Sequence, residues 1–236
     1  MDWSPSLSGT HRHDAAVAQV LKWLKQAFAS RGNRKPVLAV GRDGLMLPIR
    51  GEASYREGAT ATLAVPDRRG KRLGTIDLDR MPEPGQEMLS RQLTDLIKDV
   101  LRQWTGPLPR LAYITDGDTI RPSISAGFSS GAAAIRRRRI VIGDKRKQYK
   151  NAYNYLRKRI RFLDYHEYRR NHLPIGSGVT EAACKTVFTQ RLKQSGMTWS
   201  LEGGQRIVDP RVIQLSGLWP QVYQAYLQAK ILPEAG

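Results

Sequence analysis

Cysteine is almost absent from the sequence, whose 236 residues include only Cys184. A single thiol cannot form an internal disulfide, and with no second cysteine nearby a structural zinc site is not expected. We therefore expect Cys184 to be a small buried hydrophobic residue. No apolar run approaches the roughly 18 residues that span a bilayer, and the first residues lack the basic-then-apolar order of a signal peptide. These absences predict a cytoplasmic protein with no membrane segment.

Acidic residues are also scarce relative to basic ones. Lysine and arginine number 39 against 21 acidic residues, which gives a net charge of +18. Such an excess favours a polyanionic partner, with nucleic acid as the first candidate. Residues 136–170 alone carry 14 basic and 3 acidic side chains. The run Arg136–Arg139 is typical either of a solvated arm or of a contact to phosphates, and the latter would not read base sequence.

The first half of the chain predicts an α/β order. Apolar spacing indicates helices over 15–30 and 85–104, and strands over 59–66, 72–78 and 111–115. A further strand is indicated over 37–40, which leads into a second apolar stretch over 45–49. The segment Asp67–Gly70 has the composition of a hairpin turn. Three antiparallel strands, a helix and a further strand are the simplest arrangement. We give His11 and His13 no chemical role, because their segment is expected to be flexible and offers no third ligand.

The second half is predicted to be helical. Residues 121–150 have the composition of a linker, and helical spacing returns between Tyr149 and Leu163. A helix is expected from about Val179, with Glu181 in its first turn, followed by helical segments over 204–215 and 222–227. Pro210 is expected to kink or break the first of these two.

Two carboxylates follow predicted strands and stand beside glycines, namely Asp43 and Asp116. Carboxylates on neighbouring strands can converge, and a third from a packed helix completes an oxygen site for Mg²⁺, which supports phosphodiester chemistry. From spacing alone the pattern is weak, since Asp-Gly is also ordinary turn composition.

Longer motifs in the sequence resemble those of a known protein family. The segments PIGSGVTEAACKT (Pro174–Thr186) and QRLKQSGMTW (Gln190–Trp199) closely resemble the C-terminal signature of DDE-class transposases of bacterial insertion sequences, the Kra-type group. VGRDG (Val40–Gly44), DRRGKRLGT (Asp67–Thr75) and LAYITD (Leu111–Asp116) resemble its N-terminal half. Together the similar segments cover most of residues 11–120 and 150–229.

The resemblance implies a ribonuclease H-like fold: an α/β mixed sheet with flanking helices, followed by a helical C-terminal part. It implies Asp43, Asp116 and Glu181 as catalytic ligands of Mg²⁺ or Mn²⁺, with Asp118 as a rival for the second position. It also implies double-stranded DNA, as transposon ends and target, for the partner, a nucleoid location, and assembly of copies on DNA as an open alternative. The expected DNA-binding residues are Arg136, Arg137, Arg138, Arg139, Lys145, Arg146, Lys147, Lys185, Arg191 and Lys193.

The sequence departs from the family between its last two acidic positions. Only 64 residues separate Asp116 from Glu181, and residues 121–145 match nothing expected, which indicates an internal deletion of the last core strand. The predicted organisation is a helical segment (1–35), the first half of the core (36–120), a basic linker (121–150) and a helical half (151–236). Two hypotheses stand: a transposase with weak or no activity, or a non-catalytic DNA-binding remnant.

Overall fold

The computed structural model describes residues 5–114, 165–170, 173 and 176–231. The chain divides into two compact units, Met1–Thr115 with Gly176–Gly236, and Asp116–Ile175. In the second unit the structure describes helix α4 (Tyr165–Arg170) and Leu173, whose amide donates to the carbonyl of Tyr168. The elements below all belong to the first unit.

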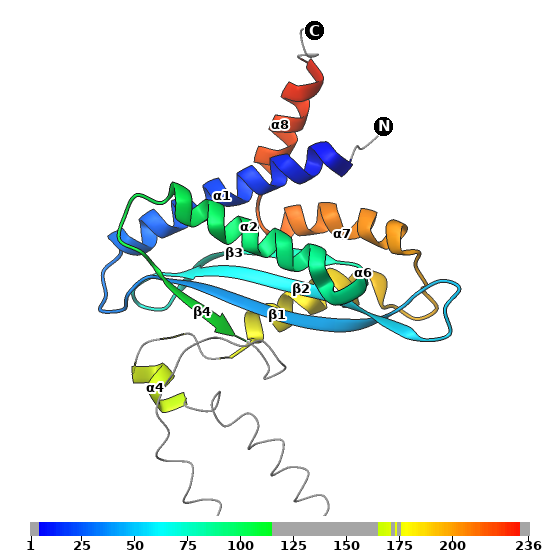
Figure 1. The fold of residues 1–236 in the computed structure, drawn as a ribbon, viewed down its shortest axis with the longest axis horizontal. Coiled ribbons are helices and arrows are strands. Elements are labelled where there is room, and N and C mark those ends of the chain that lie inside the picture. Colours follow the sequence, from blue (N-terminus) through cyan, green and yellow to red (C-terminus); the bar gives the residue numbers. More distant parts are fainter. Residues whose placement is uncertain (1–4, 115–164, 171–172, 174–175, 232–236) are drawn as a thin grey trace, which may run out of the picture. The chain divides into compact units, whose positions relative to one another are not determined.

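Four strands form one mixed sheet (Figure 1). They are β1 (Val37–Pro48), β2 (Tyr55–Pro66), β3 (Arg72–Arg80) and β4 (Arg110–Ile114), in the order β3-β2-β1-β4. The first three pair antiparallel, as the sequence predicted, and β4 lies parallel to β1. A parallel neighbour needs a crossover connection, which helix α2 (Glu87–Gln103) supplies after the short 3₁₀ turn η1 (Pro84–Gln86).

Helices α1 (Pro5–Ala29) and α2 cover one face of the sheet (Figure 1). The apolar spacing of α2 is confirmed, because its predicted stripe is buried. The main cluster that these helices form with the sheet includes Leu24, Leu38, Leu63, Ile76, Leu78, Leu89 and Leu96. The prediction of a flexible start around His11 and His13 is wrong, since α1 runs through both residues. His13 Nε2 lies 2.8 Å from a carboxylate oxygen of Asp99 on α2, which fixes this part of the helix.

The opposite face is covered by a helical segment that begins where the sequence predicted, at Gly178. It comprises α5 (Gly178–Cys184), a π-helical turn η4 (Lys185–Thr189) and α6 (Gln190–Leu192). A second apolar cluster lies beneath it and includes Leu47, Val187, Phe188 and Leu192. Glu181 occupies the first turn of α5, as expected. The π turn widens the helix where it packs on the sheet, an irregularity that is common near functional sites.

The last two helices are α7 (Leu201–Leu215) and α8 (Trp219–Ile231). Of the two expected effects of Pro210, a kink or a break, the break is wrong, because α7 continues through the proline. Val208, Val212 and Ile213 are buried around the proline, so packing holds the helix together. The carbonyl that loses its partner belongs to Arg206, an exposed residue within reach of solvent.

At the level of class, the sheet with helices on both faces confirms the predicted mixed α/β fold. None of the helices within the described ranges is long and apolar enough to cross a membrane.

Candidate functional site

Polar side chains form rows across the face of the sheet that α5 covers. Asp43 of β1 pairs with Thr60 of β2, which pairs with Asp79 of β3. Two residues along each strand, Gly41 pairs with Thr62, and Thr62 with Asp77. Because residues two apart on a strand share a face, both rows point to the same side. Thr60 and Asp79 are both fully buried there.

The sequence predicted that Asp43 follows a strand and stands beside a glycine in a turn, and this is wrong. Asp43 lies inside β1. A side chain at either nearby glycine would meet another residue. A Cβ on Gly41 would lie 1.8 Å from Oγ1 of Thr180 on α5, and one on Gly44 would lie 2.0 Å from the carboxylate of Glu57. The missing side chain of Gly41 therefore lets α5 approach the sheet closely.

Thr180 makes the contact that holds α5 against the sheet. Its Oγ1 lies 2.8 Å from Oγ1 of Thr62, above Gly41, and the residue is 2% exposed. Glu181 is the next residue, so this contact fixes the height of its backbone over β1 and β2. The structure thereby brings the helix of Glu181 onto the face of the sheet that carries Asp43.

Cys184 packs under the same helix beside Asp43 and Thr60. Burial, together with the charges of Asp43 and Asp79, raises the pKa of its thiol to about 11, although a hydrogen bond with Thr60 opposes the rise. The thiol is therefore neutral at physiological pH and only 4% exposed. The prediction that Cys184 is a buried small hydrophobic residue is confirmed.

The two described carboxylates have different surroundings. Asp43 is half-buried, and its Oδ1 accepts a hydrogen bond of 2.8 Å from the amide of Gly44. Glu181 is exposed, and its Oε1 accepts a hydrogen bond from the hydroxyl of Ser177, at the N-terminus of α5. Carboxylate oxygens of this kind are the donors that Mg²⁺ and Mn²⁺ prefer.

The third predicted carboxylate, Asp116, lies outside the described residues, as does its rival Asp118. Strand β4 is described up to Ile114, which pairs with Gly41 of β1. Within the described part of the chain, no three His, Cys, Asp or Glu side chains form a metal-binding group.

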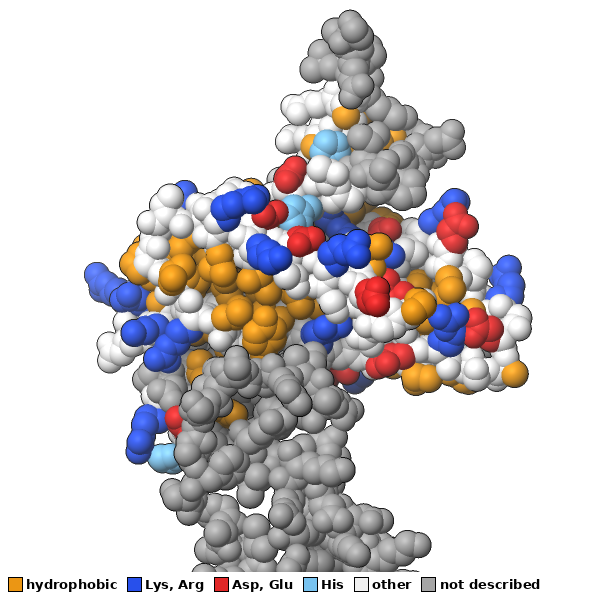
Figure 2. All heavy atoms as spheres, viewed as in Figure 1, with side chains coloured by type: hydrophobic (Ala, Val, Ile, Leu, Met, Phe, Trp, Pro, Cys, Tyr) orange, Lys and Arg blue, Asp and Glu red, His pale blue; other side chains and the backbone are white. Residues whose placement is uncertain are grey.

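Few of the predicted DNA-binding residues can be placed. Lys185, Arg191 and Lys193 are exposed on the η4–α6 segment, whereas residues 136–139 and 145–147 lie outside the described ranges. On the face shown in Figure 2, basic and acidic side chains are interspersed around an apolar area. That face of the described unit therefore carries no continuous basic surface.

Asp77 and Asp79 were missed by sequence reasoning. They alternate with apolar residues in Ile76-Asp77-Leu78-Asp79, a pattern typical of a strand with one solvated face. Burial raises the pKa of Asp77 to about 6, although the charge of Arg72 opposes this effect. Burial also raises the pKa of Asp79 well above its ordinary value, against the opposing hydrogen bond from Thr60. One oxygen of Asp79 accepts that bond at 2.5 Å, and its Oδ2 is buried without a partner.

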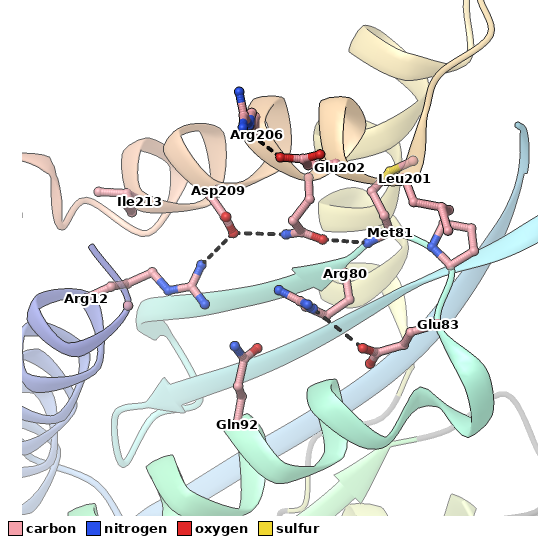
Figure 3. Close-up of a pocket in the computed structure, with 13 residues that line it drawn as sticks. Arg12, Arg80, Met81, Glu83, Gln92, Leu201, Glu202, Arg206, Asp209 and Ile213 are labelled. Atoms are coloured by element: carbon pink, nitrogen blue, oxygen red, sulfur yellow. Dashed lines mark hydrogen bonds and ion pairs between the residues drawn. The ribbon is translucent and has the colours of Figure 1, made fainter. Parts of the chain in front are cut away.

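Helix α7 explains this burial, because it covers the edge of β3 (Figure 3). The side chain of Gln205 donates to the carbonyl of Asp79 at 3.3 Å and accepts from the amide of Met81 at 2.8 Å. Ser216 accepts from the amide of Asp77 at 2.9 Å. These side chains bond backbone groups that a neighbouring strand would otherwise pair, and so they protect the edge.

A crevice of about 420 Å³ opens beside this edge, between α1, α2 and α7 (Figure 3). Its charged walls are internally paired. Arg12 bonds Asp209 at 3.2 Å, Arg206 bonds Glu202 at 2.6 Å, and Arg80 lies 3.7 Å from Glu83. None of the predicted catalytic residues lines it, and we assign it no catalytic role.

No family model matches the chain, and a search of curated proteins finds no match either.

Proposed function

We propose that this chain is a DDE-type polynucleotide transferase of the insertion-sequence class, acting on double-stranded DNA. Its sheet order, β3-β2-β1-β4 with β4 parallel to β1, is compatible with a ribonuclease H-like core. The proposal rests chiefly on one observation: α5 is seated through Thr180 on the face of β1 that carries Asp43. That contact joins two motifs 138 positions apart in the sequence, Asp43 and Glu181.

The second carboxylate of the proposal is Asp116, with Asp118 as its rival, and both lie outside the described residues. Strand β4 is described up to Ile114, two positions before Asp116 in the sequence, where it pairs with Gly41 of β1.

The donor chemistry fits a divalent ion. Asp43, Asp116 and Glu181 would hold Mg²⁺ or Mn²⁺, which in such sites activates the attacking oxygen and stabilises the leaving oxygen. The chain's own contribution is to fix the carboxylates. Gly44 holds one oxygen of Asp43, and Ser177 holds one oxygen of Glu181. Lys185, one turn beyond Glu181 and exposed, is placed to contact a phosphate of bound DNA.

A nicking assay on supercoiled DNA with Mg²⁺ or Mn²⁺ tests this proposal. We expect slow cleavage that Asp43→Asn, Asp116→Asn and Glu181→Gln each abolish. Glu202→Gln is the matched control, because Glu202 is an exposed glutamate in the first turn of α7. Asp118→Asn should retain activity. Loss of cleavage in the control as well would contradict the assignment.

A non-catalytic DNA-binding remnant is the second candidate, and the distribution of charge favours it. Residues 116–175 carry 15 basic and 5 acidic side chains, a net +10, whereas the other 176 residues carry 24 and 16, a net +8. Wild-type protein that binds DNA but never cleaves it would support this candidate and refute the catalytic one.

Both candidates predict salt-sensitive binding to DNA of any sequence. If about five phosphates are neutralised, log K should fall with log salt at a slope near −4 to −5. Replacing Arg136–Arg139 with serine should weaken binding and flatten this slope in a fluorescence-anisotropy titration. Binding that is unchanged by moderate salt would contradict DNA as the partner.

A further inference from the structure

The crevice between α1, α2 and α7 holds polar atoms that the fold leaves without partners. Nε of Arg80 and Oε1 of Gln92 are both buried and have no hydrogen-bond partner among the described residues. Both side chains line the crevice. A buried polar group that makes no hydrogen bond opposes folding, because it has given up its bonds to water. A ligand that bonds these side chains would offset that loss.

Arg80 is the least well paired of the three arginines that line the crevice. Oε2 of Glu83 lies 3.7 Å from its Nε, which is too far for a hydrogen bond. The other oxygen of Glu83 accepts from the amide of Leu89, in the first turn of α2. The remaining two arginines each donate a hydrogen bond to a carboxylate. One further negative charge beside Arg80 would therefore meet an unused donor.

Arg12 reaches the same crevice from α1. It is 9% exposed, and its guanidinium makes one hydrogen bond to a described residue, of 3.2 Å to Asp209. A guanidinium has several more N–H donors than this bond uses. Figure 3 shows the polar ends of Arg12, Arg80 and Gln92 turned into the crevice. Two guanidinium groups and an amide, from three different elements, thus face one space.

The rest of the lining sets the size and character of a ligand. Met81, Pro82, Leu201 and Ile213 add apolar surface to the crevice. Its volume of about 420 Å³ lies within the range of about 300–1,000 Å³ that is typical of small-molecule pockets. A ligand that matches this lining has an acidic head and an apolar body.

We propose that this crevice is a binding site for a small organic carboxylate with an apolar body. A planar carboxylate matches the fork of N–H groups that a guanidinium presents, so Arg80 and Arg12 hold the head. A half-turn of the Gln92 amide adds an N–H donor to the same head. A phosphate ester fits less well, because it brings nearly two negative charges close to Glu83 and Asp209.

An NMR titration of the nuclease-treated chain with naphthoate, followed through the ligand's proton signals, tests the proposal. Naphthamide and naphthyl phosphate keep the apolar body and change the head to a neutral group and to a phosphate. We expect naphthoate to bind with a Kd of about a millimolar or below, as is usual for a ligand of this size. The other two compounds should bind about tenfold more weakly.

Three variants locate the binding. Arg80→Gln should weaken the binding of naphthoate by about tenfold or more, because the head loses its charged donor. Gly9→Leu narrows the crevice without touching its polar groups, and it should fold, since a Cβ on Gly9 would meet no described atom within 4 Å. It should weaken binding similarly. Arg102→Gln is the matched control: it removes the same charge from a side chain of α2 that is 76% exposed and lies outside the crevice.

Thermal unfolding and circular dichroism should show the Gly9→Leu and Arg102→Gln chains folded. The absence of naphthoate binding by the wild type, an equal loss in Arg102→Gln, or unchanged binding in Gly9→Leu would overturn the proposal. Tighter binding of naphthyl phosphate or naphthamide would overturn the assignment of the head group. The crevice contains none of the proposed metal ligands, so each of these outcomes is independent of the nicking assay.

Discussion

The two faces of the sheet present different kinds of side chain, although helices cover both. Beneath α1 and α2 the strands present mainly hydrocarbon, as at Leu63, which is 0% exposed, and the half-buried Arg42 donates to Ser90 and Gln86. Beneath α5 and α7 the same strands present Asp43, Thr60 and Asp79, and Asp79 is also 0% exposed. Burying hydrocarbon stabilises a fold, whereas burying a carboxyl group opposes it.

The buried carboxyl groups of the α5 face lower the stability of the fold, which indicates that this face serves something other than stability. A sequence normally satisfies local rules throughout and departs from them at functional or strained positions. Each face holds a strand glycine that leaves room for a packed side chain, Gly74 at Trp23 and Gly41 at Thr180, but the α5 face also has two buried carboxyl groups and a π turn. The comparison therefore locates the candidate site without reference to any relative.

The largest effect is expected on the apolar face. Leu63→Ala removes a fully buried side chain and should lower the free energy of unfolding by about 3 kcal/mol. Leu111→Ala, at a position 38% exposed on β4, should cost far less. Urea denaturation followed by circular dichroism measures both. Similar losses in the two variants would mean that the face beneath α1 and α2 is less tightly packed than described.

The next effect tests the close approach of α5. Gly41→Ala places a methyl group against Thr180 Oγ1 and should cost about 2 kcal/mol through overpacking. Gly44→Ala meets only the end of exposed Glu57, which can swing aside, so it should be nearly neutral. Adding Thr180→Ala to Gly41→Ala should recover part of the loss, measured by urea denaturation as a double-mutant cycle. Equal losses of stability in Gly41→Ala and Gly44→Ala would contradict the close packing of α5 on β1.

The sequence predicted the apolar face better than the polar one, for a physical reason. The period of α2 and the order of the strands follow from local spacing, and the structure bears them out. The burial of Asp77 and Asp79 does not follow from local spacing, because the helix that covers them, α7, lies more than 100 residues later in the sequence. The sequence placed Asp43 at a strand end because glycine is common in turns. The reason for glycine here is not local, since a Cβ at Gly41 or Gly44 would meet Thr180 or Glu57, which are distant in sequence.

A smaller effect is expected from the buried carboxyl group of Asp79. Its pKa is raised in the folded state, chiefly by burial, so folding keeps it protonated. Its contribution to stability is then fully present below the unfolded pKa of about 3.9 and is lost as pH rises toward the folded pKa. Asp79→Asn removes that loss and should stabilise the chain at pH 8, since the amide has no charge to desolvate.

Thermal unfolding of wild type and Asp79→Asn at pH 4.5 and pH 8 measures this effect. The gain should be larger at the higher pH, and Asp77→Asn should act in the same direction across its pKa of about 6. Asp67→Asn is the control with the opposite sign. Desolvation alone would raise the pKa of Asp67, but hydrogen bonds from the amides of Lys71, Arg69 and Gly70, with the charge of Arg69, outweigh it and hold the pKa below its ordinary value. A loss of stability in Asp79→Asn at pH 8 would show that the carboxylate is needed in its charged form.

The smallest effect concerns the rim of the polar face, where the hydroxyl of Ser177 holds Glu181. Both residues lie toward solvent, so Ser177→Ala should change the free energy of unfolding by less than about 0.5 kcal/mol. The carboxylate, however, loses the donor that restricts its rotamer. A net hydrogen bond of about 0.5–1 kcal/mol then corresponds to roughly two- to fivefold weaker Mn²⁺ binding. Ser177→Thr should restore the affinity, and Thr186→Ala should leave it unchanged, because that hydroxyl bonds the carbonyl of Ala182 instead. Electron paramagnetic resonance of free Mn²⁺ measures each affinity, and equal values for wild type and Ser177→Ala would show that Glu181 needs no support from its own helix terminus.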